Sequence, residues 1–204
     1  MSAPCFPYTE ADIGFLAARD PALGAAMREI GRVERRVMPD VFQALIHSIA
    51  GQQISTKAQA TVWRRLCELL GDIRPERLLA AGEEGLIRCG LSGRKAGYMR
   101  AAAEAVLSGA LDLEALQAMS DAAVVETLVR LPGVGVWTAE MLLLFSLCRR
   151  DVFSTRDFGI RRGVSLLYGA EHPDETLFSA LRARYSPLGS VASLYLWEIS
   201  ARIK

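Results

Sequence analysis

A glycine-rich turn between two helical patterns is the most informative stretch of the chain, because its residue types are suited to binding an anion. Pro132, Gly133 and Gly135 interrupt the patterns, so the segment predicts a helix, a tight hairpin and a second helix. Because glycine has no Cβ, a large anion such as a DNA phosphate can approach the backbone N–H groups of this turn. The second helix begins at about Val136, and its positive N-terminal end faces the same anion. The segment predicts a phosphate clamp that does not read base sequence.

A single carboxylate, Asp157, follows some twenty residues later within Ser154 to Gly163. Alone, an Asp before Phe158-Gly159-Ile160-Arg161 is commonly a helix N-cap, and glycines such as those of the hairpin commonly just end helices. A capping Asp can also be a reactive carboxylate. The order and spacing of the hairpin and Asp157 together indicate a function that neither group indicates alone.

The hairpin, the apolar helix after it, a short loop and Asp157 resemble the helix-hairpin-helix (HhH-GPD) DNA glycosylases. The likeness is greatest to the 3-methyladenine, or alkylbase, glycosylase II branch, and it extends from about Phe42 to Trp197. It implies base-excision repair, in which a damaged base is flipped out of the duplex and its N-glycosidic bond is hydrolysed. The implied partner is double-stranded DNA that contains a damaged base.

Asp157 matches the family's catalytic aspartate. As the glycosidic bond breaks, positive charge develops on the sugar, and a nearby carboxylate stabilises it electrostatically. At the position of Trp137, relatives that also cut the DNA backbone carry a lysine, which forms a Schiff base with the sugar. A tryptophan cannot do so. We therefore expect a monofunctional enzyme that uses water and leaves an abasic site.

The resemblance places Trp137 and Trp197 in the base pocket, and Tyr195 is close to Trp197 in sequence. Alkylated purines such as 3-methyladenine and 7-methylguanine are positively charged, so they leave readily and bind well to an aromatic face. The alternative is that these three rings only pack the protein interior.

A Gln-Gln pair, Gln52 and Gln53, precedes a helix start at Ser55. When a base is flipped, another group must fill the gap in the stack. The family's wedge position falls on Gln53, whose side chain could fill the gap and pair with the orphaned base, next to Gln52 in the minor groove. The alternative is that both glutamines satisfy backbone groups around the helix start.

The resemblance also implies a set of residues that contact DNA phosphates. Gly93 to Tyr98 is similar to a second backbone-contacting turn of the family, although solvated surface is an equally plain role for its two cations. The expected phosphate contacts are Gly133, Val134, Gly135, Thr138, Arg94 and Lys95.

The chain of 204 residues is rich in Ala and Leu, and no part of it has the pattern of a strand-rich region, so we expect an all-α fold. The family fold implies two helical lobes with a DNA-binding cleft. Residues 1-36 plus 150-204 would form one lobe, and residues 37-149 the other, with the helix-hairpin-helix at 121-147. The length implies the compact helical core without the extra N-terminal domain of some relatives.

The four cysteines are far apart and none follows Cys148, so the iron–sulfur loop of some relatives is not expected. His47 and His172 have no neighbours at metal-ligand spacing, and the chemistry needs no metal, so we expect no cofactor. A monovalent cation at the hairpin carbonyls, as in relatives, is left open. No signal peptide or membrane span is seen, which favours a cytoplasmic, nucleoid-associated protein. The oligomeric state is left open, with a monomer as the default expectation.

Two other functions fit part of the pattern. A glycosylase for oxidised or deaminated bases would use the same hairpin and Asp157, because only the base pocket selects the lesion. A helix-hairpin-helix DNA-binding protein without catalysis would keep the hairpin but would require neither Asp157 nor the Gln52-Gln53 loop.

Overall fold

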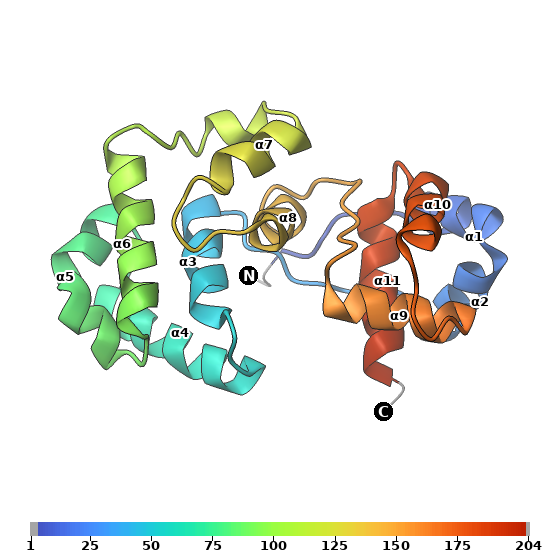
Figure 1. Ribbon diagram of the computed structural model, residues 1–204, viewed down its shortest axis with the longest axis horizontal. Coiled ribbons are helices and arrows are strands. Elements are labelled where there is room, and N and C mark those ends of the chain that lie inside the picture. The colour runs from blue at the N-terminus through green and yellow to red at the C-terminus, as the bar shows by residue number, and fades with distance from the viewer. Residues whose placement is uncertain (1–3, 203–204) are drawn as a thin grey trace. The chain divides into compact units, whose positions relative to one another are not determined.

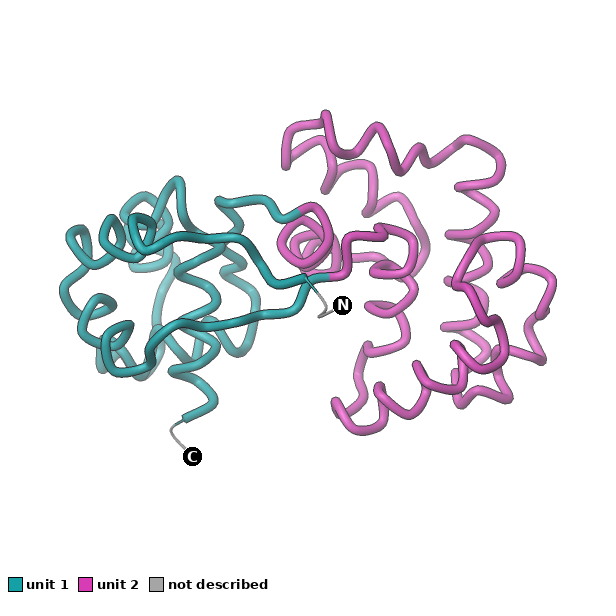
Figure 2. The backbone as a smooth tube through the Cα atoms, turned by 180° about the vertical axis from the view of Figure 1, so that it is seen from behind, with its two compact units in different colours: residues 1–37, 148–204 teal, residues 38–147 magenta. Residues whose placement is uncertain are grey.

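The computed structural model describes residues 4–202, and these form helices joined by short loops (Figure 1). The described residues contain no β-sheet, only one antiparallel bridge between Cys5 and Arg36. The all-α fold predicted from the sequence is confirmed. The chain divides into two compact units: unit 1 is Met1–Val37 with Cys148–Lys204, and unit 2 is Met38–Leu147 (Figure 2).

Unit 2 is a continuous stretch of chain in which polar side chains cap the starts of α3, α4, α6 and α7. Asp40, Ser55, Ser92 and Ser120 each accept a hydrogen bond from the backbone N–H three residues later, which satisfies a group that the helix itself cannot. The elements are α3 (Val41–Gly51), α4 (Thr56–Leu70), α5 (Pro75–Arg88), α6 (Gly93–Leu107), the 3-10 turn η1 (Ala115–Gln117), α7 (Asp121–Leu128) and α8 (Val136–Phe145).

Helix α8 of unit 2 packs against α3 and α7. Its residues from Thr138 to Leu144 are buried except for Glu140, and a helix that is apolar on nearly all sides must be covered on nearly all sides. Because α8 follows directly from the hairpin, this burial fixes the position of the hairpin.

Unit 1 combines helices from both ends of the chain, and the elements are α1 (Glu10–Arg19), α2 (Pro21–Ile30), α9 (Phe158–Tyr168), α10 (Glu175–Tyr185) and α11 (Gly189–Arg202). Helix α11 is buried from Gly189 to Leu196 and packs against α9 and α2. The buried α11 therefore joins the N-terminal helices to the segment that carries Asp157.

The structure differs from the expected helices at several ends. The sequence pattern predicts a short helix from Leu113 to Met119, but the structure forms only the 3-10 turn η1 there. The pattern predicts that the two hairpin helices end at Arg130 and Leu147, and α7 and α8 each end two residues earlier. It predicts a further helix from Ile160, whereas α9 begins at Phe158 because Asp157 caps it.

A buried carboxylate, Asp20, links three helices of unit 1. It is 1% exposed, caps α2 through the Leu23 N–H at 3.0 Å, and accepts hydrogen bonds from the Tyr168 hydroxyl and from Arg184 Nη1, the latter at 2.9 Å. Burial raises the pKa of Asp20, and the hydrogen bonds from Tyr168, Leu23 and Arg184 lower it. The lowering effect is the larger, so the pKa of Asp20 lies below its usual value.

We expect Asp20→Asn to lower the free energy of unfolding by about 2 kcal/mol at pH 7, because the amide weakens charge-assisted hydrogen bonds. Because the pKa of Asp20 is lower in the folded than in the unfolded state, its ionised carboxylate stabilises the fold at pH values above the unfolded pKa. This stabilisation is lost as the pH falls through the folded pKa. The gap between wild type and variant should therefore narrow below about pH 4, as measured by urea unfolding.

The matched control is Asp174→Asn, at the exposed cap of α10. Asn caps a helix about as well as Asp, so this variant should unfold like the wild type. A pH-independent gap for Asp20→Asn would contradict the ionic role of Asp20.

Candidate functional site

The hairpin between α7 and α8 is closed by a hydrogen bond from the Val134 N–H to the Leu131 carbonyl at 3.1 Å. Gly133 has φ 77°, in the left-handed region that disfavours side chains. A Cβ placed there would lie 2.1 Å from Cδ2 of Tyr98, so the Tyr98 ring packs directly on the Gly133 backbone. Position 133 therefore requires glycine for both its backbone conformation and its packing.

The start of α8 is open toward an anion. Gly135 is its N-cap and provides no side-chain cap, and the first N–H groups of an α-helix have no acceptor within the helix. The indole of Trp137 is 42% exposed at this helix start, whereas Thr138 is buried. The helix end thus presents backbone donors beside an exposed aromatic ring.

The loop after α3 is bound to the hairpin. The side-chain amide of Gln52 donates from Nε2 to the Gly133 carbonyl at 2.8 Å, so Gln52 satisfies a backbone group of the hairpin rather than one around the helix start at Ser55. Gln53 is different, because it is exposed and has φ 56°. A non-glycine residue in this region is uncommon and points to a functional constraint.

Lys95 of α6 contacts the same loop. Its Nζ donates to the carbonyls of Ala50 at 2.9 Å and Gln52 at 2.6 Å, and burial lowers its pKa. The sequence predicted that Lys95 either contacts a phosphate or is a solvated surface cation. In the structure its ammonium group instead binds two backbone carbonyls. The neighbouring Arg94 is exposed.

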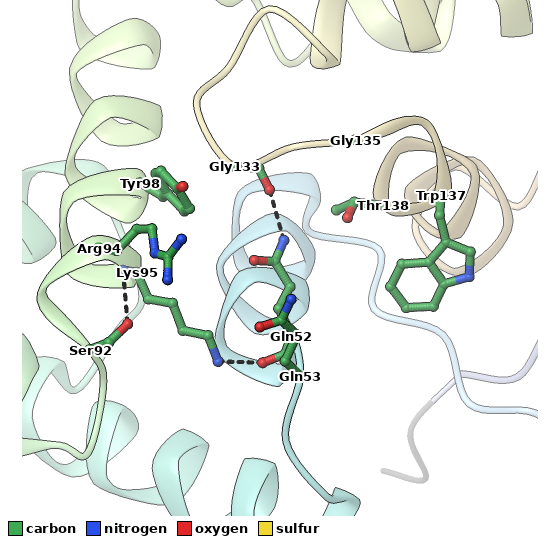
Figure 3. Close-up of a pocket in the computed structure, with 10 residues that line it drawn as sticks. All are labelled: Gln52, Gln53, Ser92, Arg94, Lys95, Tyr98, Gly133, Gly135, Trp137 and Thr138. Atoms are coloured by element: carbon green, nitrogen blue, oxygen red, sulfur yellow. Dashed lines mark hydrogen bonds between the residues drawn. The ribbon is translucent and has the colours of Figure 1, made fainter. Parts of the chain in front are cut away.

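These residues surround one cavity of about 400 Å³ within unit 2, shown with its hydrogen bonds in Figure 3. It contains most of the residues that the sequence assigned to DNA contacts, together with Trp137. The lining residues are Gln52, Gln53, Ser92, Arg94, Lys95, Tyr98, Gly133, Gly135, Trp137 and Thr138.

Asp157 lies in unit 1 and caps α9, accepting from the Ile160 N–H at 2.8 Å. The same carboxylate oxygen, Oδ1, accepts from Nε1 of Trp197 at 2.7 Å. The indole passes so close to the helix start that a Cβ on Gly159 would lie 2.5 Å from Trp197 Cδ1. The cap and the indole together fix the orientation of the carboxylate.

The segment that leads to Asp157 is attached to α11 by buried serines. The Val152 N–H donates to Ser190 Oγ at 2.9 Å, and Ser193 Oγ donates to the Val152 carbonyl at 3.1 Å. Asp151 accepts from the Gly189 N–H at 3.0 Å. The loop is therefore anchored to a buried helix rather than suspended in solvent.

Tyr195 is fully buried in unit 1, with its ring edge-on to Tyr8 at 6.3 Å and its hydroxyl 3.4 Å from that of Tyr8. This placement favours the interior packing role over the base-pocket role. Trp197 is only partly buried and contacts Asp157, whereas Trp137 belongs to the cavity of unit 2.

Sequence reasoning missed two residues that line the cavity of unit 2, Ser92 and Tyr98. Ser92 could have been found, because a serine before Gly93-Arg94-Lys95 has the pattern of an N-cap. No local pattern indicates that Tyr98 packs on Gly133 or that Trp197 packs on Gly159, since each contact joins segments that are distant in the sequence.

No group of His, Cys, Asp and Glu in residues 4–202 has the arrangement of a metal site. Over the same residues, no helix is long and apolar enough to cross a membrane. The cavity of unit 2 can bind an anion at the backbone donors that begin α8. The site in unit 1 places one oriented carboxylate, Asp157, next to the indole of Trp197.

The chain belongs to the HhH-GPD superfamily of base excision DNA repair proteins, whose family model matches residues 46–186. Among curated relatives, the DNA-3-methyladenine glycosylase 1 of Schizosaccharomyces pombe is 30% identical over 164 residues, which cover 78% of this chain and 72% of the relative.

Solved structures give the same result over nearly the whole chain. A DNA-3-methyladenine glycosidase from Bacillus halodurans has a TM-score of 0.84 and 34% identity, covering 99% of this chain and 94% of its own. The 3-methyladenine DNA glycosylase of S. pombe in complex with abasic DNA has a TM-score of 0.83 and 30% identity, covering 93% and 96%.

We expect Gly133→Ala to lower the free energy of unfolding by about 1–3 kcal/mol, because alanine is strained at this φ and its Cβ displaces Tyr98. Affinity for duplex DNA should fall as the hairpin shifts. Thermal unfolding and fluorescence anisotropy with a labelled duplex measure the two effects.

Gly135→Ala separates folding from binding. A Cβ at position 135 meets no atom within 4 Å, so Gly135→Ala should lose only the modest stability, below about 1 kcal/mol, by which glycine is preferred to alanine at an N-cap. Its DNA affinity should nevertheless decrease, because the methyl group occupies the approach to the helix start. Unchanged affinity would place the phosphate elsewhere.

Proposed function

We propose that this protein is a monofunctional base-excision-repair DNA glycosylase that hydrolyses the N-glycosidic bond of alkylated purines, such as 3-methyladenine and 7-methylguanine, and leaves an abasic site. The observation that carries the proposal is the oriented carboxylate of Asp157, which accepts from the Ile160 N–H and from Trp197 Nε1 in a chain of this repair family.

In this proposal Asp157 is the catalytic residue. Bond cleavage leaves positive charge on the deoxyribose, and a carboxylate already held in place stabilises that charge without reorganising during the reaction. Asp157 also orients the attacking water. Trp137 stands where a strand-cutting relative would need an amine, so no Schiff base forms and the sugar-phosphate backbone stays intact.

The choice of alkylated purines is supported by the matched relatives, which include DNA-3-methyladenine glycosylases, and by the aromatic residues of the two sites. A cationic base gains from contact with an indole face, and both Trp137 and Trp197 are accessible to some extent. We assign Trp197, which donates to Asp157 within unit 1, and not Tyr195, to recognition of the flipped base.

DNA binding is assigned to the cavity of unit 2. Backbone donors at Gly133, Gly135 and the first turn of α8, with Arg94, face the phosphates and bind DNA without reading its sequence. The Val134 N–H is not among them, because it donates to the Leu131 carbonyl. We assign Gln53 as the wedge that fills the gap left in the base stack after flipping. Its side chain is exposed in the loop after α3 and is therefore free to enter the duplex.

No cofactor takes part in the proposed chemistry. A monovalent cation at the hairpin is compatible with it, since the carbonyls of Leu131 and Gly133 each accept one hydrogen bond and each retains a second lone pair. We further propose that the protein acts as a monomer on double-stranded DNA in the nucleoid.

We expect Asp157→Asn to slow base release roughly 100-fold or more, since the neutral amide no longer stabilises the charged transition state, while DNA affinity is retained. Trp197→Phe, which removes the indole donor and keeps an aromatic ring, should slow release about tenfold. The assay follows release of 7-methylguanine and 3-methyladenine from duplexes, with strands resolved before and after alkali.

The outcomes are distinct. Strand breaks in wild-type reactions before alkali would contradict the monofunctional mechanism. Release of only an oxidised or deaminated base would retain Asp157 and change the substrate. DNA binding with no release of any base, and no effect of Asp157→Asn, would identify a non-catalytic binding protein.

A further inference from the structure

We propose that Lys95 is a positioning residue for the wedge: it acts through the Gln52 main chain to hold Gln53 ready to enter the duplex, and its principal role is not phosphate binding. The inference rests on the proposed function, which it deepens by assigning a residue to the base-flipping step.

The ammonium group of Lys95 contacts protein backbone. Its ammonium donates to the carbonyls of Ala50 and Gln52, both at the C-terminal end of α3, at 2.9 and 2.6 Å. Carbonyls at a helix C-terminus lack intrahelical donors and carry partial negative charge, so a cation there completes the helix end. Two of the three ammonium protons are thereby engaged.

Gln52 is held at two points. Lys95 binds its main-chain carbonyl, while its own side-chain amide binds the Gly133 carbonyl at 2.8 Å. The next residue is Gln53, which is exposed and has the left-handed backbone value φ 56°. Such a conformation costs free energy in a free loop and persists only where its surroundings impose it. The double attachment of Gln52 provides that constraint (Figure 3).

A preformed wedge matters only when a base pair must be opened. Flipping a paired base requires unpairing and unstacking, and the inserted side chain compensates for both. A damaged base in a single-nucleotide bulge has no partner to lose. If Lys95 acts through Gln53, its removal should slow excision from the paired duplex more than from the bulge.

The test measures single-turnover release of 7-methylguanine at saturating enzyme from two substrates, one with the lesion opposite cytosine and one with the opposite nucleotide omitted. The variants are Lys95→Met, Gln53→Ala, the double variant, and Lys95→Arg, which keeps a charged donor. Arg94→Met is the matched control, because it removes an exposed cation from the preceding position of the same helix.

We expect Lys95→Met to slow release from the paired duplex roughly tenfold, the effect of losing a charge-assisted hydrogen bond, and to change release from the bulge little. In the Gln53→Ala background the same substitution should have almost no further effect, because coupled residues are non-additive. Lys95→Arg should recover much of the rate.

Arg94→Met should behave differently from Lys95→Met. A phosphate contact supplies affinity, so its loss should weaken binding to both substrates alike and reduce the salt dependence of binding by about one unit. The same behaviour from Lys95→Met would make Lys95 a phosphate contact and overturn the inference.

Equal slowing by Lys95→Met on paired and bulged substrates, or additive effects with Gln53→Ala, would also overturn it. Thermal unfolding of each variant is measured alongside, and if Lys95→Met does not fold, Lys95→Gln takes its place in the same double-mutant cycle. If wild-type protein releases no base from either substrate, the proposed function itself fails, which is a different result from release that is insensitive to Lys95.

Discussion

The loop after α3 and the hairpin before α8 are both irregular backbone, and each has carbonyls that no neighbouring helix residue satisfies. The Gln52 side chain binds the hairpin at Gly133, and Lys95 binds the loop at Gln52 and Ala50. Because α8 is buried, the hairpin is fixed, and the loop is fixed through it. Among the exposed groups of this region, Gln53 depends on these few bonds for its position, whereas Arg94 and Trp137 are placed by the helices α6 and α8.

Much of the helical fold follows from local sequence. Asp40, Ser55 and Ser120 mark helix starts because their side chains satisfy backbone N–H groups three residues later, and this chemistry can be recognised in the sequence. The stretch from Leu113 to Met119 was expected to be helical and forms only η1, because a short segment gains too little from helix formation to extend beyond a single turn.

The candidate sites divide in the same way. The hairpin and Asp157 could be found because glycines, caps and their spacing are local features. The role of Lys95, the indole bond to Asp157 and the packing of Tyr98 on Gly133 could not, because each joins segments that are distant in the sequence. Tyr195 shows the opposite error, since closeness to Trp197 in sequence did not give it the same surroundings: α11 directs its ring into the interior.

The order of segments in the two units also affects how the chain folds during synthesis. Unit 2 is continuous and can form as soon as it leaves the ribosome, but unit 1 needs both ends of the chain. Helices α1 and α2 must wait for α11, which packs against α2, while all of unit 2 is translated. At a translation rate of about 5–20 residues per second this interval is on the order of ten seconds. During it, the faces of α1 and α2 that later contact α9, α10 and α11 are uncovered and can be bound by chaperones.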